Sequence, residues 1–190
     1  MAIKPGERRL QILQTLAAML EGPRAEKVTT AALAAKLDVS EAALYRHFAS
    51  KAQMFEGLIE FIETTLFTLV NKIAAETQEG AAQAQQIVAV LLGFAEKNPG
   101  MTRVLIGDAL VNEDDRLQVR INQLYDRIEA ALRQSLRIAQ AAGNWPGDPG
   151  AEANVLLSYV LGRWQLFAKS GFKRMPQDGW ELQRKFLFGA

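Results

Sequence analysis

The stretch SEAALYRHFASK, residues 40–51, contains the only histidine in the chain, His47, among several other side chains that donate hydrogen bonds. An imidazole can act as a general acid or base, as a packed structural group, or as a donor to an anion. No acid–base partner lies at a useful spacing from His47, so catalysis is the weakest of these interpretations. A structural histidine and a phosphate contact both stay open when this residue is considered alone.

Composition is that of an ordinary globular protein. The chain has 190 residues, 49% of them hydrophobic and 23% charged, enough for one sizeable core or for a small domain fused to a larger one. The net charge of +1 means that any basic surface for nucleic acid must be local. With no cysteine and one histidine, only carboxylates are left as metal ligands, so we expect no metal and no cofactor.

Hydropathy predicts neither a membrane span nor a signal peptide. No window approaches about 20 consecutive apolar residues, and the first residues lack the apolar core of a signal sequence. We therefore expect a cytoplasmic protein with no membrane partner. Apolar residues recur with helical spacing almost everywhere, and no strictly alternating run indicates a strand, which predicts an all-α protein of about nine helices.

Two short helices are predicted near the N-terminus, one after Thr30 and one after Ser40, joined by a tight turn at Asp38. Braced by a preceding helix, they form a helix-turn-helix arrangement, with a plain helical hairpin as the alternative. If Leu44 points inward, Phe48 lies one turn further on the same face, while Arg46 falls on the opposite side. The outer face of the second helix is then free to enter a DNA groove.

The residues on and around that outer face suit DNA. Small side chains allow a helix to approach a major groove closely, and hydroxyl, phenol, imidazole and ammonium groups suit the phosphate backbone. Arg46 could read a base edge, ideally guanine, or hold a phosphate. The predicted contacts to double-stranded DNA are Thr29, Thr30, Ser40, Ala42, Ala43, Tyr45, Arg46, His47 and Lys51.

The pattern Thr29-Thr30, Leu33-Ala34 and VSEAALYRHFASK closely resembles the DNA-binding domain of TetR-family regulators. Asp38 stands where that family usually has glycine, and aspartate tolerates turn geometry. The resemblance implies an all-α homodimer, with a three-helix helix-turn-helix domain over residues 1–50 and a helical dimerisation and partner-binding domain over residues 51–190. It also implies one or more dimers at each DNA site.

Further segments, LLGFAEKNPGMTRVLIGDAL and DRLQVRINQLYDRIEAALRQSLR, resemble one group within that family, the nucleoid occlusion factors. The resemblance implies a nucleoid-associated protein that, when bound to chromosomal sites, binds the C-terminal tail of the division protein FtsZ and antagonises ring assembly. This group often has arginine where the chain has Lys97. The resemblance also implies a groove that binds this FtsZ tail, called the tail groove below. Its expected residues are Phe61, Ile62, Val90, Gly93, Phe94, Lys97, Asn98 and Met101. Aromatic and methionine residues at helical spacing are otherwise more often core.

The helix predicted after Gly150 is apolar on more than one face, so it needs a second partner beyond its own body. Pairing the last two helices with those of a second copy would give a four-helix interface, and a larger private core in a monomer is the alternative. The predicted interface stripe is Leu157, Val160, Trp164 and Phe167.

Two other functions are alternatives to nucleoid occlusion, namely a ligand-responsive repressor and an enzyme. A ligand-responsive TetR-type repressor would hold an apolar small molecule in a deep, closed pocket of the body. An enzyme is the weakest interpretation, because the sequence shows no nucleophile–base pair, phosphate loop or metal-ligand spacing.

Overall fold

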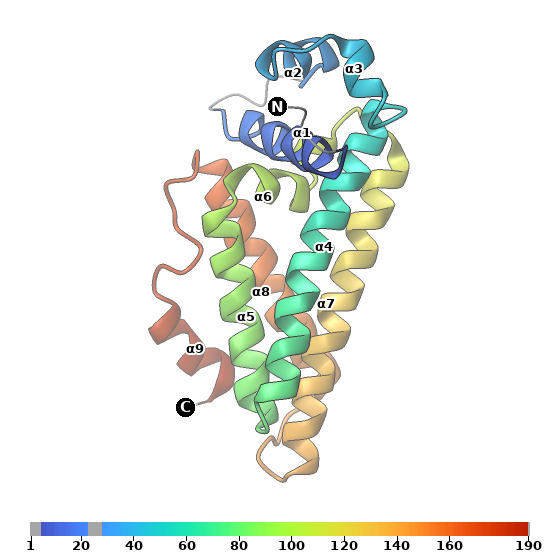
Figure 1. Ribbon diagram of the computed structural model, residues 1–190. Helices are drawn as coiled ribbons and strands as arrows, with labels where there is room; N and C mark the ends of the chain where they lie inside the picture. Colours follow the sequence, from blue (N-terminus) through green and yellow to red (C-terminus); the bar gives the residue numbers. More distant parts are fainter. Residues whose placement is uncertain (1–4, 23–27, 190) are drawn as a thin grey trace. The chain divides into compact units, whose positions relative to one another are not determined.

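The computed structural model describes residues 5–22 and 28–189, and over these residues the chain is entirely helical (Figure 1). No strand occurs in the described part, which confirms the all-α prediction. None of the helices within it is long and apolar enough to cross a membrane. The elements are α1 (Pro5–Met19), α2 (Thr30–Lys36), α3 (Glu41–Tyr45), α4 (Lys51–Glu76), α5 (Gly80–Lys97), α6 (Pro99–Leu105), η1, a 3₁₀ turn (Asp108–Leu110), α7 (Asp115–Ala141), α8 (Pro149–Lys169) and α9 (Trp180–Phe188).

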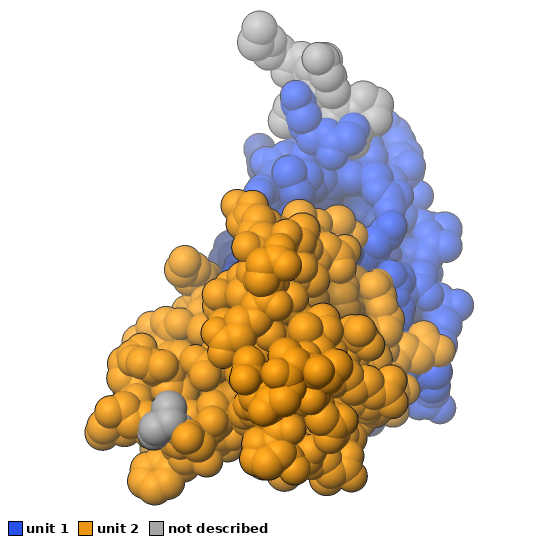
Figure 2. All heavy atoms as spheres, turned by 90° about the horizontal axis from the view of Figure 1, so that it is seen from below, with its two compact units in different colours: residues 1–62, 98–121 blue, residues 63–97, 122–190 orange. Residues whose placement is uncertain are grey.

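The chain forms two compact units, which divide it differently from the boundary expected at residue 50 (Figure 2). Unit 1 comprises residues 1–62 and 98–121, and unit 2 comprises residues 63–97 and 122–190. Helices α4 and α7 each begin in unit 1 and continue without a break into unit 2. The helix-turn-helix region therefore shares its compact unit with α6 and with the start of α7.

In unit 1, α1 packs against α6 at backbone distance. A Cβ atom added to Gly100 would lie 1.9 Å from the carbonyl oxygen of Ala17, so only glycine fits there. Ile12 and Leu16 of α1 are buried, as are Val104 and Leu105 of α6. Helix α1 thus packs against α6, a segment that lies about 80 residues further along the chain.

Side-chain caps define where the short helices begin. The Thr29 hydroxyl accepts a hydrogen bond from the backbone amide of Ala32 at 3.1 Å, and the Ser40 hydroxyl accepts one from Ala43 at 3.3 Å. At the start of α4 the Ser50 hydroxyl accepts from the amide of Gln53 at 3.2 Å. The Gln53 side chain reaches back to the amide of Ala49 at 2.9 Å. These two bonds form a reciprocal cap, in which the Gln53 side chain accepts from the amide of Ala49 rather than from that of Ser50.

Unit 2 is built around α5 and α8. The indole of Trp164 is fully buried and donates a hydrogen bond to the carbonyl oxygen of Leu91 at 3.0 Å. Gly80 lets the start of α5 approach α7, because an added Cβ atom would lie 2.2 Å from the Ser135 carbonyl oxygen. Within α7, Arg133 pairs with Glu129 one turn earlier at 2.5 Å.

Candidate nucleic-acid interface

The turn between α2 and α3 has the geometry that a helix-turn-helix needs. Asp38 adopts a left-handed conformation, with φ at 53°, a region in which glycine is unstrained and aspartate is tolerated. The amide of Val39 then bonds back to the Ala34 carbonyl at 3.0 Å, which ends α2. The departure from the family's glycine is therefore accommodated at a small conformational cost.

The predicted inner and outer faces of α3 are confirmed. Leu44 and Phe48 are almost completely buried, while Ala42, Tyr45 and Arg46 are exposed. Ala43 is partly exposed, and so is His47. The exposed face therefore carries a small residue near its start and a phenol and a guanidinium near its end, a combination that suits close approach followed by polar contacts.

The hydroxyl groups at the helix starts are oriented by their capping bonds. Thr29 and Ser40 each use the oxygen lone pairs for the cap, which leaves each hydroxyl hydrogen to donate to a phosphate oxygen. The Thr30 hydroxyl instead donates to the Glu41 carboxylate at 2.5 Å. Thr30 must exchange that carboxylate for a phosphate if it is to contact DNA.

His47 lies beside a small surface pocket of about 180 Å³. Arg8 of α1 and Arg46 of α3 also line this pocket, over an aliphatic floor. Two arginines therefore line the same pocket as His47, and no carboxylate is among its lining residues. This environment suits a contact to a phosphate better than acid–base chemistry.

The ammonium group of Lys51 forms an ion pair with the Glu113 carboxylate, from the turn before α7. It also lies 5.6 Å from the ring centroid of Phe55. The two side chains of the ion pair are only 22% and 11% exposed, for lysine and glutamate respectively. A phosphate contact by Lys51 therefore competes with a carboxylate of the same chain, which sequence spacing gave no means to foresee.

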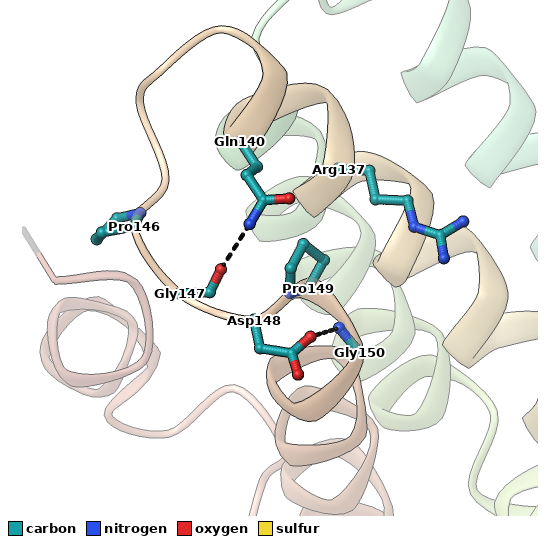
Figure 3. Close-up of a pocket in the computed structure, with 7 residues that line it drawn as sticks. All are labelled: Arg137, Gln140, Pro146, Gly147, Asp148, Pro149 and Gly150. Atoms are coloured by element: carbon teal, nitrogen blue, oxygen red, sulfur yellow. Dashed lines mark hydrogen bonds between the residues drawn. The ribbon is translucent and has the colours of Figure 1, made fainter.

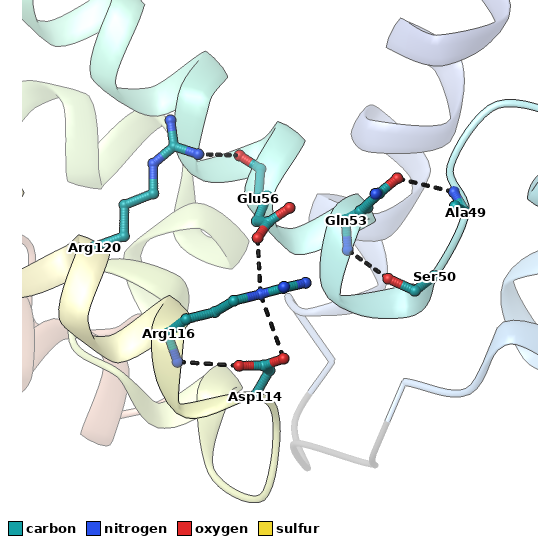
Figure 4. A network of polar contacts seen from close by, with 7 residues as sticks. All are labelled: Ala49, Ser50, Gln53, Glu56, Asp114, Arg116 and Arg120. Atoms are coloured by element: carbon teal, nitrogen blue, oxygen red, sulfur yellow. Dashed lines mark hydrogen bonds and ion pairs between the residues drawn. The ribbon is translucent and has the colours of Figure 1, made fainter.

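Arg116 and Arg120 secure this turn to the first helical turns of α4 (Figure 4). The Arg116 guanidinium lies 2.9 Å from the Glu56 carboxylate and 3.3 Å from Asp114. Arg120 donates to the Glu56 carbonyl oxygen at 3.4 Å. These contacts keep Glu113 close to Lys51 independently of the ion pair between them.

The eight residues of the predicted tail groove divide evenly between the two units. In unit 1, Ile62 and Met101 are buried, whereas Phe61 is 37% exposed. Asn98 precedes α6 in a non-helical conformation, with φ at −134° and ψ at 66°, and the proline after it disfavours helical geometry there.

In unit 2, Phe94 is buried, Val90 is partly exposed and Lys97 is exposed. The space beside Gly93 holds the side chain of Gln177, whose Nε2 would lie 3.2 Å from an added Cβ atom. The same amide group donates to the Ala89 carbonyl oxygen at 3.4 Å. The room that this glycine was expected to leave for a peptide is therefore taken by the loop before α9.

Arg163 of α8 fixes the loop that carries Gln177. Its guanidinium donates to the carbonyl oxygens of Met175 and Asp178 at 2.8 Å each and of Pro176 at 2.9 Å. Next to it, the Tyr159 hydroxyl donates to the Gln183 side chain at 2.5 Å. Burial raises the pKa of Tyr159, and the charge of Arg163 opposes that rise.

The predicted dimer stripe requires a correction. Leu157, Val160, Trp164 and Phe167 are buried within the single chain, so they belong to the core of unit 2 and have no surface to offer a second copy. The exposed apolar side chains of the last two helices are Val155, Leu166, Leu182 and Phe186. Helical periodicity identified the apolar stripe of α8 correctly. It could not show whether that stripe or another apolar face of the helix is buried by the same chain.

The body pockets that the structure describes are open at the surface. The larger, about 540 Å³, lies between the end of α7 and the start of α8 (Figure 3). Gln140 donates to the Gly147 carbonyl oxygen at 3.0 Å across it, and Asp148 caps the amide of Gly150 at 2.8 Å. Neither this pocket nor the open one at Trp180 has the closed apolar form expected of a small-molecule site.

Comparisons with known proteins agree with this architecture. Residues 25–58 match the family model described as bacterial regulatory proteins, tetR family, and residues 78–190 match that described as Tetracyclin repressor-like, C-terminal domain (SlmA-like). Among solved structures, the TetR-family regulator PfmR from Thermus thermophilus has a TM-score of 0.79 at 20% identity, covering 95% of this chain and 98% of that one. AibR, solved with isovaleryl coenzyme A and operator DNA, has a TM-score of 0.77 at 18% identity, covering 96% and 98%.

The fold and the exposed face of α3 thus define a DNA-binding regulator. The chain belongs to the TetR family of bacterial regulatory proteins. It is 51% identical over 184 residues to the nucleoid occlusion factor SlmA of Alteromonas mediterranea, covering 96% of this chain and 94% of that protein. It is 49% identical to SlmA of Idiomarina loihiensis over the full length of both chains.

Proposed function

We propose that the protein is a nucleoid occlusion factor: a homodimer that binds specific chromosomal sites and, while bound, engages FtsZ and antagonises division-ring assembly over the nucleoid. The observation that carries this proposal is the near full-length similarity to proteins named nucleoid occlusion factor SlmA. The exposed face of α3 supports its DNA-binding part, because small and polar residues occupy the side that would enter the groove.

Two reading helices require two chains. DNA sites with two-fold symmetry are read by dimers whose recognition helices enter successive major grooves. Val155 and Leu166 on α8 and Leu182 and Phe186 on α9 supply an exposed apolar surface for such a dimer. Phe186 is 89% exposed and Leu182 is 68% exposed, values that favour burial against a second copy.

For FtsZ, the testable part of the predicted groove is its exposed part. Phe61 offers an aromatic anchor and Lys97 a cation, whereas Ile62, Phe94 and Met101 are buried and support the fold. Lys97→Ala removes an exposed side chain, whereas Phe61→Ala removes one that is only 37% exposed, so thermal unfolding must show that the Phe61 variant is folded.

A titration of a fluorescent FtsZ tail peptide tests this proposal. Peptide binding is measured for the wild-type protein, for Phe61→Ala and for Lys97→Ala, with and without a duplex selected from a random library by the wild-type protein. The proposal is supported if the wild-type protein binds the peptide in the presence of DNA and if each of the two substitutions weakens that binding. If the peptide binds in neither condition, the protein is instead the ligand-responsive repressor that forms the alternative.

A further inference from the structure

The reading helix α3 is too short to hold its own conformation. It spans five residues, and isolated helices of that length are not stable in water. Its start is capped by Ser40, and Leu44 and Phe48 tie its inner face to the core. The predicted DNA contacts Tyr45, Arg46 and His47 all lie at its other end, where the backbone leaves helical geometry.

That end is held by Arg9 of α1. The guanidinium Nη1 donates to the carbonyl oxygen of His47 at 2.8 Å. The same guanidinium lies over the ring of Phe48, 4.1 Å from its centroid. One planar cation thus makes both a charge-assisted hydrogen bond and a cation–π contact with two consecutive residues at the C-terminal end of α3.

The Phe48 ring is also in close contact with α4. A Cβ atom added to Gly57 would lie 3.0 Å from Cε1 of Phe48 and 3.4 Å from Cδ2 of Leu13. The ring therefore has little freedom to move away from Arg9. A guanidinium stacked on an immobile ring is itself held in place, so its bond to His47 fixes the backbone there.

We propose that Arg9 is a positioning residue for DNA reading: it sets the end of α3 that carries Tyr45, Arg46 and His47 and acts through Phe48 and the His47 carbonyl group. This inference rests on the reading role of α3 in the proposed function. A cation that binds only phosphate adds equally to specific and non-specific affinity. A residue that positions Arg46 for base reading, together with the phosphate contacts Tyr45 and His47, adds more to specific than to non-specific affinity.

Arg9→Lys separates the two roles, because lysine keeps the charge and loses both the fork and the planar face. Binding to the selected duplex and to a scrambled duplex is measured over a range of salt concentrations. We expect specific affinity to fall about tenfold, the value of roughly one charge-assisted hydrogen bond. Non-specific affinity is expected to fall by less, because only the phosphate contacts of Tyr45 and His47 are affected there. The slope of affinity against salt is expected to stay unchanged, and amide hydrogen exchange at residues 47 and 48 is expected to become faster.

Arg8 provides the matched control. It is the preceding residue, and its guanidinium donates a hydrogen bond to the side chain of Gln11 in its own helix at 2.7 Å. Arg8→Lys should leave the ratio of specific to non-specific affinity unchanged. Thermal unfolding of each variant shows that both are folded at the temperature of the binding measurement.

Three results would overturn the inference. Unchanged specific affinity in Arg9→Lys is the first. The second is an equal loss of specific and non-specific affinity in Arg9→Gln, with a salt slope lower by about 0.9, which would make Arg9 a phosphate contact. The third is a loss of specificity in Arg8→Lys equal to that in Arg9→Lys. Failure of the wild type to select any duplex contradicts the proposed function instead, so the two failures are distinguishable.

Discussion

Lys51, the first residue of α4, is ion-paired with Glu113, which precedes α7 by two residues. The ammonium group lies where the helix-turn-helix region ends, so one cation is shared between a potential phosphate contact and an internal carboxylate. The Arg116–Glu56 contact holds the turn that carries Glu113, so the Glu113 carboxylate stays close to Lys51 even when the Lys51 ammonium group binds a phosphate.

Glu113→Gln is therefore expected to raise DNA affinity. Removing the carboxylate frees the ammonium of Lys51 and takes away a negative charge close to the DNA, for a gain of roughly threefold to tenfold at low salt. Fluorescence anisotropy with a labelled duplex measures this gain, which should shrink as salt is added. Asp115→Asn, which removes an exposed carboxylate two residues away from Glu113, is the control. Equal or weaker binding by Glu113→Gln would contradict the competition.

His47→Ala and Tyr45→Phe test the backbone contacts of α3. Each loses one donor to phosphate, so affinity should fall for specific and non-specific duplexes alike, by about 1 kcal/mol for each lost hydrogen bond. Electrophoretic mobility shifts with both duplexes provide the measurement. A loss confined to the specific duplex would instead assign these residues to base reading.

Asp38→Gly is expected to stabilise the chain slightly. The left-handed φ of 53° costs aspartate conformational energy that glycine does not pay, although glycine loses more backbone entropy on folding, for a net gain of about 0.5 kcal/mol. Ala35→Gly, in the ordinary helical geometry of α2, should destabilise by about 1 kcal/mol. Urea unfolding of the two variants gives the comparison, and a loss of stability in both would show that Asp38 contributes more than its backbone geometry.

Phe186→Ser is expected to weaken or abolish dimerisation. It removes the most exposed large apolar side chain of the described residues, from the surface proposed to meet a second copy. Sedimentation should show a shift from dimer towards monomer at equal concentration. Val119→Ser removes an exposed apolar residue on α7 and should leave the sedimentation profile unchanged. A dimer unaffected by Phe186→Ser places the interface elsewhere.

Gly100→Ala is expected to destabilise unit 1 by roughly 1–3 kcal/mol, because the added methyl group would overlap the Ala17 carbonyl oxygen. Gly6→Ala is the control, since an added Cβ atom there meets nothing within 4 Å. Thermal unfolding measures both. Equal melting temperatures would mean that α1 and α6 separate at little cost.

The sequence predicted local features well. The inward and outward faces of α3 followed from helical periodicity, and the two short helices were expected after Thr30 and Ser40, close to where α2 and α3 begin. What it could not supply was pairing over long separations. Lys51 and Glu113 lie 62 positions apart, and Arg9 and His47 lie 38 apart, so no spacing rule joins them. The dimer stripe failed for a related reason, because Trp164 is covered by Leu91 of the same chain.

The unbroken passage of α4 and α7 between the two units bears on how this protein can be taken apart. These two crossings lie inside continuous helices, so a cut at either one, by a protease or at a cloning boundary, would not release a self-sufficient DNA-binding module. A fragment ending at residue 58, where the match to the tetR family model ends, would lack Val104, Leu105 and Leu117, all fully buried in unit 1. Grafting this reading head onto another body therefore means transplanting two separate stretches of sequence.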